Sequence, residues 1–278
     1  MQTNSIFEFS TNNGSIIGRK INVESSRKIV ILAAGHNGFY HYGMFPTIQE
    51  TLANKGISSI AFNYTHCGIS NDGSTFEDLE KYQKNCRRLE MEDICSVYHF
   101  IQSDDSFIHP MNIFLFAYSM GGLSATIASH YLQSKGNLIN GLILLCSLKT
   151  LDVRSPEVMT EWKEKGVYFR HNPRTNQFLP QGSEFLEETL ASDSTWNMER
   201  VCKELKMPVF VAHAKDDEAV PFDHSESIFS WITSNPNQNK FLAIPNAGHT
   251  LNTAHPNKRD SEEFQYFMEH LVEWVNVI

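Results

Sequence analysis

The sequence lacks several features that would place it in other protein classes. No apolar run reaches about 18 residues, so we expect neither a transmembrane helix nor membrane insertion. The first ten residues lack a basic region followed by an apolar one, so no signal peptide is expected. The five cysteines show no C-x-x-C spacing, and such an odd, scattered set is typical of reduced thiols in a cytoplasmic protein.

Basic charge is also scarce. The chain has 23 Lys and Arg against 32 Asp and Glu, a formal net charge of −9, and no basic cluster with interleaved aromatic residues. A nucleic-acid partner is therefore not expected. No G-x-G-x-x-G sequence or P-loop is present, and the spacing of Asp72, Asp78 and Glu80 does not suggest metal ligands. We expect no cofactor and no metal.

The 278 residues are 41% hydrophobic, which is enough for a sizeable core. Short apolar runs alternate with amphipathic stretches, a pattern that predicts a mostly parallel, twisted α/β sheet with helices on both faces. An N-terminal hairpin is expected to form its antiparallel edge. The predicted strands are residues 6–9, 16–23, 28–34, 58–63, 113–116, 141–146, 207–213 and 240–244. The predicted helices are residues 45–54, 86–103, 123–132, 225–233 and 261–277.

The most informative stretch is residues 112–122, N-I-F-L-F-A-Y-S-M-G-G. A buried strand, a small-x-Ser-x-Gly turn and a helix follow one another there, which is the arrangement of a nucleophile elbow around Ser119. The residues two before and two after the serine must be small, and Ala117 and Gly121 meet that need. The helix directs its unpaired N–H groups at the serine. An ordinary strand-to-helix turn is the alternative interpretation.

A nucleophilic serine needs a base, and the base needs an acid that orients it. The strand at 207–213 is followed by A-K-D-D-E-A-V-P, and the strand at 240–244 by P-N-A-G-H-T. Both loops leave the carboxyl ends of predicted parallel strands, where open α/β sheets place their sites. Asp217 and His249 are the candidates; Asp216 and His255 are the weaker alternatives.

These three motifs, in this order, resemble the α/β-hydrolase superfamily, in its serine-aminopeptidase-like and cinnamoyl-esterase-like branch. The similarity extends over nearly the whole chain. The family's acid loop, H-G-x-x-D-x-x-V-P, corresponds to residues 213–221 and selects Asp217 as the acid, and its x-x-G-H corresponds to residues 246–249. The resemblance implies an α/β-hydrolase fold in which Ser119 is the nucleophile and His249 the base.

The oxyanion hole should use two backbone N–H groups. One belongs to Met120, directly after the nucleophile. The other comes from the loop after the strand at 28–34, where the family usually has His-Gly-x and this chain has Ala34-Gly35-His36. The residue after the glycine is His36, which we favour as the donor, with Asn37 as the alternative.

Regular alternation stops between residues 147 and 200, where no clear strand is predicted. We expect an insertion that covers Ser119 as a lid, with the hydrolase core formed by residues 1–146 and 201–278. Aromatic side chains of this lid either line an acyl or aryl pocket or attach the lid to the core: Trp162, Tyr168, Phe169 and Phe178. Asn37 and Tyr118 are further candidates for substrate contact.

The arginines of the insertion have two interpretations. Arg154, Arg170 and Arg174 either bind a carboxylate or phosphate of the substrate or pair with the glutamates of the same segment. The sequence does not decide between them.

The predicted function is cleavage of a carboxylic ester with a small or medium acyl or aryl group, through a Ser-His-Asp triad and an acyl-enzyme. Three alternatives stay open: a thioesterase, lactone-processing or acyltransferase tailoring enzyme; an aminopeptidase-like peptidase; and a non-catalytic ligand-binding protein. A small acyl substrate is the expected partner, and a homodimer is left open.

Overall fold

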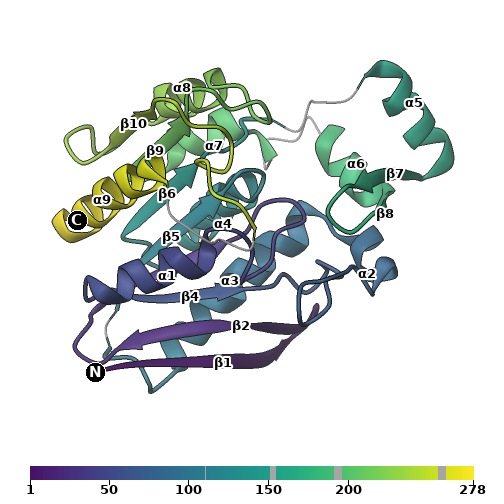
Figure 1. The fold of residues 1–278 in the computed structure, drawn as a ribbon. Helices are drawn as coiled ribbons and strands as arrows, with labels where there is room; N and C mark the ends of the chain where they lie inside the picture. The colour runs from purple at the N-terminus through teal and green to yellow at the C-terminus, as the bar shows by residue number, and fades with distance from the viewer. Residues whose placement is uncertain (110, 151–154, 191–195, 256–260) are drawn as a thin grey trace.

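An eight-stranded sheet forms the centre of the computed structural model, which describes residues 1–109, 111–150, 155–190, 196–255 and 261–278 (Figure 1). The strands are β1 (Gln2–Thr11), β2 (Gly14–Val23), β3 (Lys28–Ala33), β4 (Ser58–Phe62), β5 (Asn112–Tyr118), β6 (Gly141–Leu145), β7 (Val167–Asn172), β8 (Gln177–Gly182), β9 (Val209–Ala214) and β10 (Lys240–Ile244). The helices are α1 (Phe45–Asn54), α2 (Leu79–Lys84), α3 (Arg87–Ser103), α4 (Gly121–Ser134), α5 (Pro156–Lys165), α6 (Ser183–Leu190), α7 (Met198–Glu204), α8 (Asp223–Trp231) and α9 (Glu262–Val277).

The strand order in the sheet is β1-β2-β4-β3-β5-β6-β9-β10. The hairpin β1–β2 pairs antiparallel, and β2 also runs antiparallel to β4. The other neighbours in the sheet, in the order β4-β3-β5-β6-β9-β10, pair parallel. This arrangement confirms the predicted mostly parallel sheet with an antiparallel edge. Because the parallel strands point the same way, their carboxyl ends lie along one edge of the sheet.

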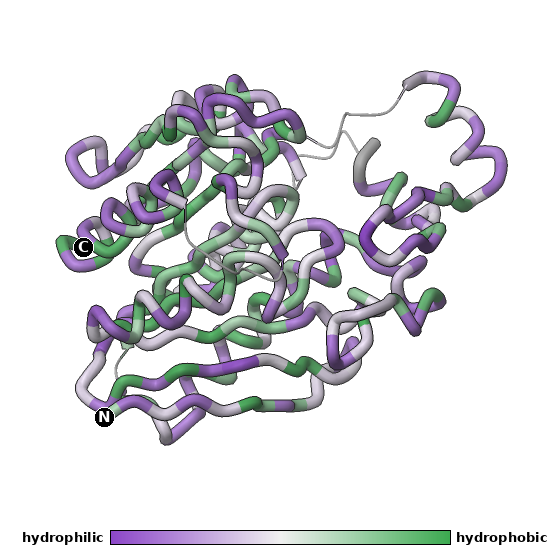
Figure 2. Tube along the Cα trace, viewed as in Figure 1, coloured by the Kyte–Doolittle hydropathy of each residue, from purple (hydrophilic) through white to green (hydrophobic). Residues whose placement is uncertain are grey.

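The two faces of the sheet carry separate hydrophobic cores, because successive side chains of a strand point to opposite faces. On β5, Ile113 and Leu115 pack in the core beneath α3 and α4, whereas Phe114 and Phe116 pack in the core beneath α1 and α9. The strand is buried on both faces, which explains its continuous apolar run. In Figure 2 the hydrophobic colour gathers along these central strands.

Side-chain caps set several helix starts. Asp78, Ser155, Asn197 and Ser261 each accept a hydrogen bond from the backbone N–H three residues later. The sequence predicted α1 and placed the ends of α3, α4, α8 and α9 within two residues, but it did not predict the short helix α2.

The insert, residues 147–200, contains more regular structure than the sequence predicted. The expectation that it has no strand was wrong: β7 and β8 form an antiparallel hairpin between α5 and α6. The strands are short, and Pro180 interrupts the β pattern, which a two-stranded ribbon tolerates because its outer edges need no partner. Figure 1 shows this hairpin beside the sheet and next to α2, with α5 at the upper right, above the hairpin.

No helix in the described residues combines the length and the apolar composition needed to cross a membrane.

Candidate functional site

The tight turn between β5 and α4 holds Ser119 in a conformation that non-glycine residues rarely adopt. Its φ is +56°. The turn also requires small neighbours, because a Cβ added to Gly121 would lie 2.3 Å from the carbonyl oxygen of Ala34. Gly35 approaches the serine in the same way: a Cβ there would lie 2.9 Å from the Cβ of Ser119. The Ser119 hydroxyl thus lies where the loop at Gly35 packs against the turn at Gly121. The close packing leaves no room for a side chain at either glycine.

The structure brings Ser119, His249 and Asp217 into one chain of hydrogen bonds. The Nε2 atom of His249 lies 3.0 Å from the Oγ atom of Ser119, and its Nδ1 atom lies 2.7 Å from Oδ2 of Asp217. The acid follows β9 and the histidine follows β10, so both loops start at the same edge as the turn after β5. An ionised Asp217 accepts the Nδ1–H, which leaves Nε2 as an acceptor facing the hydroxyl.

Asp217 is surrounded by hydrogen-bond donors, whereas the preceding residue, Asp216, is exposed. The backbone N–H groups of Ala219 and Val220 both donate to Oδ1 at 2.8 Å. Burial alone would raise the pKa of Asp217, but hydrogen bonds from His213 and His249 outweigh it and hold this pKa well below its usual value. The carboxylate therefore stays ionised under any ordinary assay condition.

A second histidine, His213, contacts the same carboxylate from the buried side. Its Nε2 atom lies 3.3 Å from Oδ2 of Asp217 and 3.0 Å from the carbonyl oxygen of Val220, and its Nδ1 pairs with the hydroxyl of Ser225. The side chain has no exposed surface. In the sequence His213 is only the first residue of the acid motif, and no local pattern predicts its contact with Asp217.

A thiol completes the surroundings of the acid. Donor atoms of Cys146, His213 and Asp217 lie within 4.8 Å of one another, a spacing that could hold a metal ion. However, both nitrogens of His213 are engaged with protein partners. Burial raises the pKa of the Cys146 thiol well above its usual value, so it stays protonated beside Asp217. This donor set fits a hydrogen-bond network better than a metal site.

The loop after β3 lies beside Ser119 and is held by a tyrosine from α2. The hydroxyl of Tyr82 donates to Oδ1 of Asn37 at 2.7 Å, and its oxygen lies 3.2 Å from Nε2 of His36. Asn37 has a φ of +61°, which asparagine tolerates better than most residues. On the other side of the serine, the N–H of Met120 makes no hydrogen bond within the described part of the chain. No motif in the sequence indicates this role of Tyr82.

A cavity of about 400 Å³ opens at Ser119 between the core and the insert. Its described lining combines the serine and histidine with apolar and polar side chains from both segments: His36, Asn37, Ser119, Met120, Leu148, Met159, Trp162, Arg170, Gln181, Phe185, Ala219, Val220 and His249. Of the lid aromatics named from the sequence, Trp162 lines this cavity. Gln181 and Phe185 were not anticipated.

The alternation of side chains along β7 and β8 explains where the other three predicted aromatic residues lie. Tyr168 and Phe169 are successive residues of β7 and therefore point to opposite faces. Tyr168 packs against Trp162, with 5.6 Å between ring centroids, and Phe169 is 56% exposed. Phe178, on the outward face of β8, is 64% exposed. Neither Phe169 nor Phe178 lines the cavity, because only every second residue of each strand can reach it.

Tyr118 and the remaining arginines also have defined places. The hydroxyl of Tyr118 donates to the backbone carbonyl of His249 at 3.0 Å, so it supports the histidine loop. Arg170 lines the cavity, whereas Arg174 lies over three aromatic rings at the hairpin turn. Arg154 lies outside the described residues.

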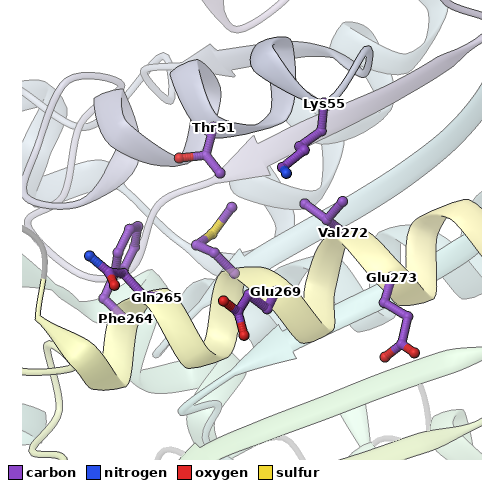
Figure 3. A pocket seen from close by; sticks show the side chains of 8 residues that line it. Thr51, Lys55, Phe264, Gln265, Glu269, Val272 and Glu273 are labelled. Atoms are coloured by element: carbon purple, nitrogen blue, oxygen red, sulfur yellow. The ribbon is translucent and has the colours of Figure 1, made fainter.

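Two other hollows help to define the site. A smaller one of about 140 Å³ shares His36, Ser119 and His249 with the main cavity. Another, of about 430 Å³, lies between α1 and α9 and is lined by Thr51, Lys55, Phe264, Gln265, Met268, Glu269, Val272 and Glu273 (Figure 3). None of the described residues that line it is a serine, cysteine or histidine, so they offer no nucleophile–base pair.

Comparison with known sequences gives a partial match. A sequence model of the prolyl oligopeptidase family (Peptidase_S9) matches residues 162–276. The matched stretch includes Asp217 and His249 and begins after Ser119. None of the curated protein sequences matches the chain.

Comparison with solved structures gives matches over nearly the whole length. Est1E from Butyrivibrio proteoclasticus is 15% identical, with a TM-score of 0.68 and 98% of both chains covered. A dienelactone hydrolase from Anabaena variabilis is 11% identical, with a TM-score of 0.68, covering 99% of this chain and 98% of that one. The alpha/beta hydrolase GrgF from Penicillium sp. sh18 is 12% identical, with a TM-score of 0.74 and the same coverage. At these identities the similarity concerns the fold.

Proposed function

This chain has the α/β-hydrolase fold, and we propose that it is a serine hydrolase that cleaves carboxylic esters with a small or medium acyl or aryl group. The observation that carries the proposal is the hydrogen-bond chain from Ser119 through His249 to Asp217. Each member sits in a loop at the carboxyl edge of the sheet, and a cavity opens directly over the serine.

The mechanism follows from these contacts. As the hydroxyl oxygen of Ser119 attacks the ester carbon, its proton passes to Nε2 of His249, and Asp217 stabilises the imidazolium. N–H groups of Met120 and His36 would bind the oxyanion. His249 then protonates the departing alcohol, which leaves an acyl-enzyme. Water attacks the acyl carbon and gives a proton to Nε2 of His249. His249 then returns this proton to the Ser119 oxygen as the bond to the acyl carbon breaks, which releases the acid and regenerates Ser119.

Cavity size and lining support the substrate class. A volume of about 400 Å³ lies near the low end of the range for small-ligand pockets. Leu148, Met159 and Phe185 give it an apolar part suited to an acyl chain or aromatic ring. The smaller hollow is also lined by Ser119, and we assign it to the alcohol part of the ester. In this proposal residues 147–200 act as a lid, and the five free thiols suit a reducing, cytoplasmic compartment.

One alternative has a specific observation in its favour. The match of residues 162–276 to the prolyl oligopeptidase family favours hydrolysis of a peptide bond by the same three residues. The matched segment does not include Ser119, so we place this alternative second. A panel of p-nitrophenyl esters, acyl thioesters and aminoacyl anilides distinguishes the two.

The direct test is labelling by a fluorophosphonate probe combined with ester turnover. The wild-type chain should be labelled on Ser119 and should hydrolyse p-nitrophenyl butyrate. Ser119→Ala should lose labelling and at least about a thousandfold of the turnover while keeping its fold. Full activity in Ser119→Ala would refute the proposal.

A pair of matched variants tests the assignment of Asp217 as the catalytic acid. Asp217→Asn should lower kcat roughly a thousandfold, because the amide can hold His249 in the wrong tautomer. Asp216→Asn, one residue away and exposed, should keep kcat within about twofold of wild type. The opposite ranking would move the acid to Asp216.

A further inference from the structure

The serine cavity has a single cationic side chain in its described lining. Arg170 is the only Lys, Arg, Asp or Glu among the described residues that line it. The rest of the lining is apolar or neutral and polar, apart from the two histidines. The cavity thus differs in charge from the chain as a whole, whose net charge is −9.

The hairpin geometry places this arginine on the face that lines the cavity, although Arg170 itself is solvent-exposed. Arg170 and Tyr168 are two residues apart on β7 and therefore share a face. Its cross-strand partner on β8 is Leu179, which is 1% exposed. The neighbours Phe169 and Phe178 belong to the outward face. Replacing either of them would therefore leave the cavity's charge and lining unchanged.

The N–H groups of the Arg170 guanidinium are available to a ligand. Within the described residues it makes no hydrogen bond and no salt bridge. Nearby cations of the insert are engaged: Arg174 donates to the carbonyl oxygen of Gly73, and Lys165 pairs with Glu161. A guanidinium presents a planar fork of N–H groups that matches a carboxylate in a bidentate pair.

We propose that the preferred esters carry a carboxylate at the end remote from the scissile bond and that Arg170 binds it. This inference rests on the proposed ester hydrolysis at Ser119. Both residues line one small cavity, so a single ligand can contact both. A carboxylate fits better than a phosphate, because one arginine in a largely apolar lining neutralises one negative charge. Arg170 acts as a specificity residue and takes no part in bond breaking.

The experiment compares two substrates that differ only in charge: mono-(4-nitrophenyl) adipate and its methyl ester. Ser119→Ala supplies the background rate for each. For wild type, kcat/KM should be higher for the anionic ester. Arg170→Gln should lower kcat/KM for the anionic ester about tenfold and change it less than twofold for the methyl ester. Arg170→Lys should retain part of the preference, since it keeps the charge and loses the fork.

Lys163→Gln is the matched control. It removes the same charge from an exposed position of α5 that does not line the cavity. It should leave the ratio of the two kcat/KM values unchanged. If Lys163→Gln lowers the ratio as much as Arg170→Gln, the overall electrostatic field of the protein explains the preference, and the assignment to Arg170 is refuted.

The outcomes separate this inference from the proposed function. If the methyl ester is turned over by Ser119 but the anionic ester is not preferred, or if Arg170→Gln affects both substrates equally, the inference fails and the hydrolase proposal stands. If neither ester is turned over and the fluorophosphonate leaves Ser119 unlabelled, the proposed function fails first.

Discussion

Two residues with strained backbones mark the reactive edge of the sheet. Ser119 and Cys146 directly follow the neighbouring strands β5 and β6 and have φ values of +56° and +48°. Each such conformation costs a non-glycine residue on the order of 1–3 kcal/mol. The surrounding structure holds both: the N–H of Ser119 donates to Leu145, and that of Cys146 donates to Ala212. The strain lies where the serine must leave the strand direction to meet His249.

The loop beside the serine depends on a phenol at some distance in the sequence. Tyr82→Phe removes the hydrogen bonds to Asn37 and His36, so the loop beside Ser119 should be held less firmly in its position. We expect kcat for p-nitrophenyl butyrate to fall roughly tenfold, with KM changed less than twofold. Steady-state kinetics measure both.

Tyr131→Phe is the control for this prediction, because Tyr131 is exposed on α4 and does not line the serine cavity. It should behave as wild type. If Tyr82→Phe leaves kcat unchanged, the phenol has no part in holding the loop.

Among the elements, the β7–β8 hairpin shows most clearly what anchors the insert. At its turn the guanidinium of Arg174 donates to the carbonyl oxygen of Gly73 at 2.7 Å. It lies over the rings of Phe39, Tyr42 and Phe76, 5.2–5.7 Å from their centroids. The side-chain amide of Gln177 bonds both the N–H and the carbonyl of Phe76. Arg174 and Gln177, three positions apart in the hairpin, therefore fasten it to the core.

Arg174→Gln should loosen this attachment without altering the sheet. The lost cation–π contacts and hydrogen bond are together worth about 2 kcal/mol, so the hairpin should open more often. Limited proteolysis at residues 172–176 should accelerate at least about tenfold, while the melting temperature of the core changes little. Arg27→Gln, at an exposed position outside the insert, should show neither effect. Equal cleavage rates in all three proteins would contradict the anchoring role.

The inward face of the hairpin could not be predicted from the sequence. The alternation within β7 and β8 spans six residues each, and Pro180 and a run of polar residues weaken it. Whether Phe169 or Arg170 faces inward depends on which side of the ribbon packs on the core. That choice comes from contacts with α2 and the loop at Gly73, which no local pattern contains.

On the scale of the whole molecule, a buried carboxyl group links folding to pH. Asp93 on α3 has no exposed surface; its Oδ2 accepts from the N–H and the hydroxyl of Thr65 at 2.7 and 2.9 Å. Burial raises its pKa to about 7 despite these bonds. The folded state therefore keeps the proton where the unfolded chain releases it, so stability falls as pH rises from about 4 to above 7.

Asp93→Asn removes this titration and keeps an oxygen for Thr65. Between pH 4 and pH 8 the wild type should lose up to about 4 kcal/mol of unfolding free energy relative to the variant. Urea unfolding of both proteins at several pH values measures the difference. Asp105→Asn, at an exposed site near the end of α3, should follow wild type at every pH. Parallel pH curves for wild type and Asp93→Asn would overturn the assignment.

The sequence by itself determined the strand pattern, the elbow around Ser119 and the order of the loops that carry Asp217 and His249. These features are local: apolar runs, small residues at a turn and short motifs after strands report on their own neighbourhoods. Only the tertiary structure decided that His213 supports the acid, that Tyr82 holds the loop at His36 and that Arg170 enters the cavity. Each is a contact between segments distant in the chain, and the packing of the sheet, α2 and the insert fixes it.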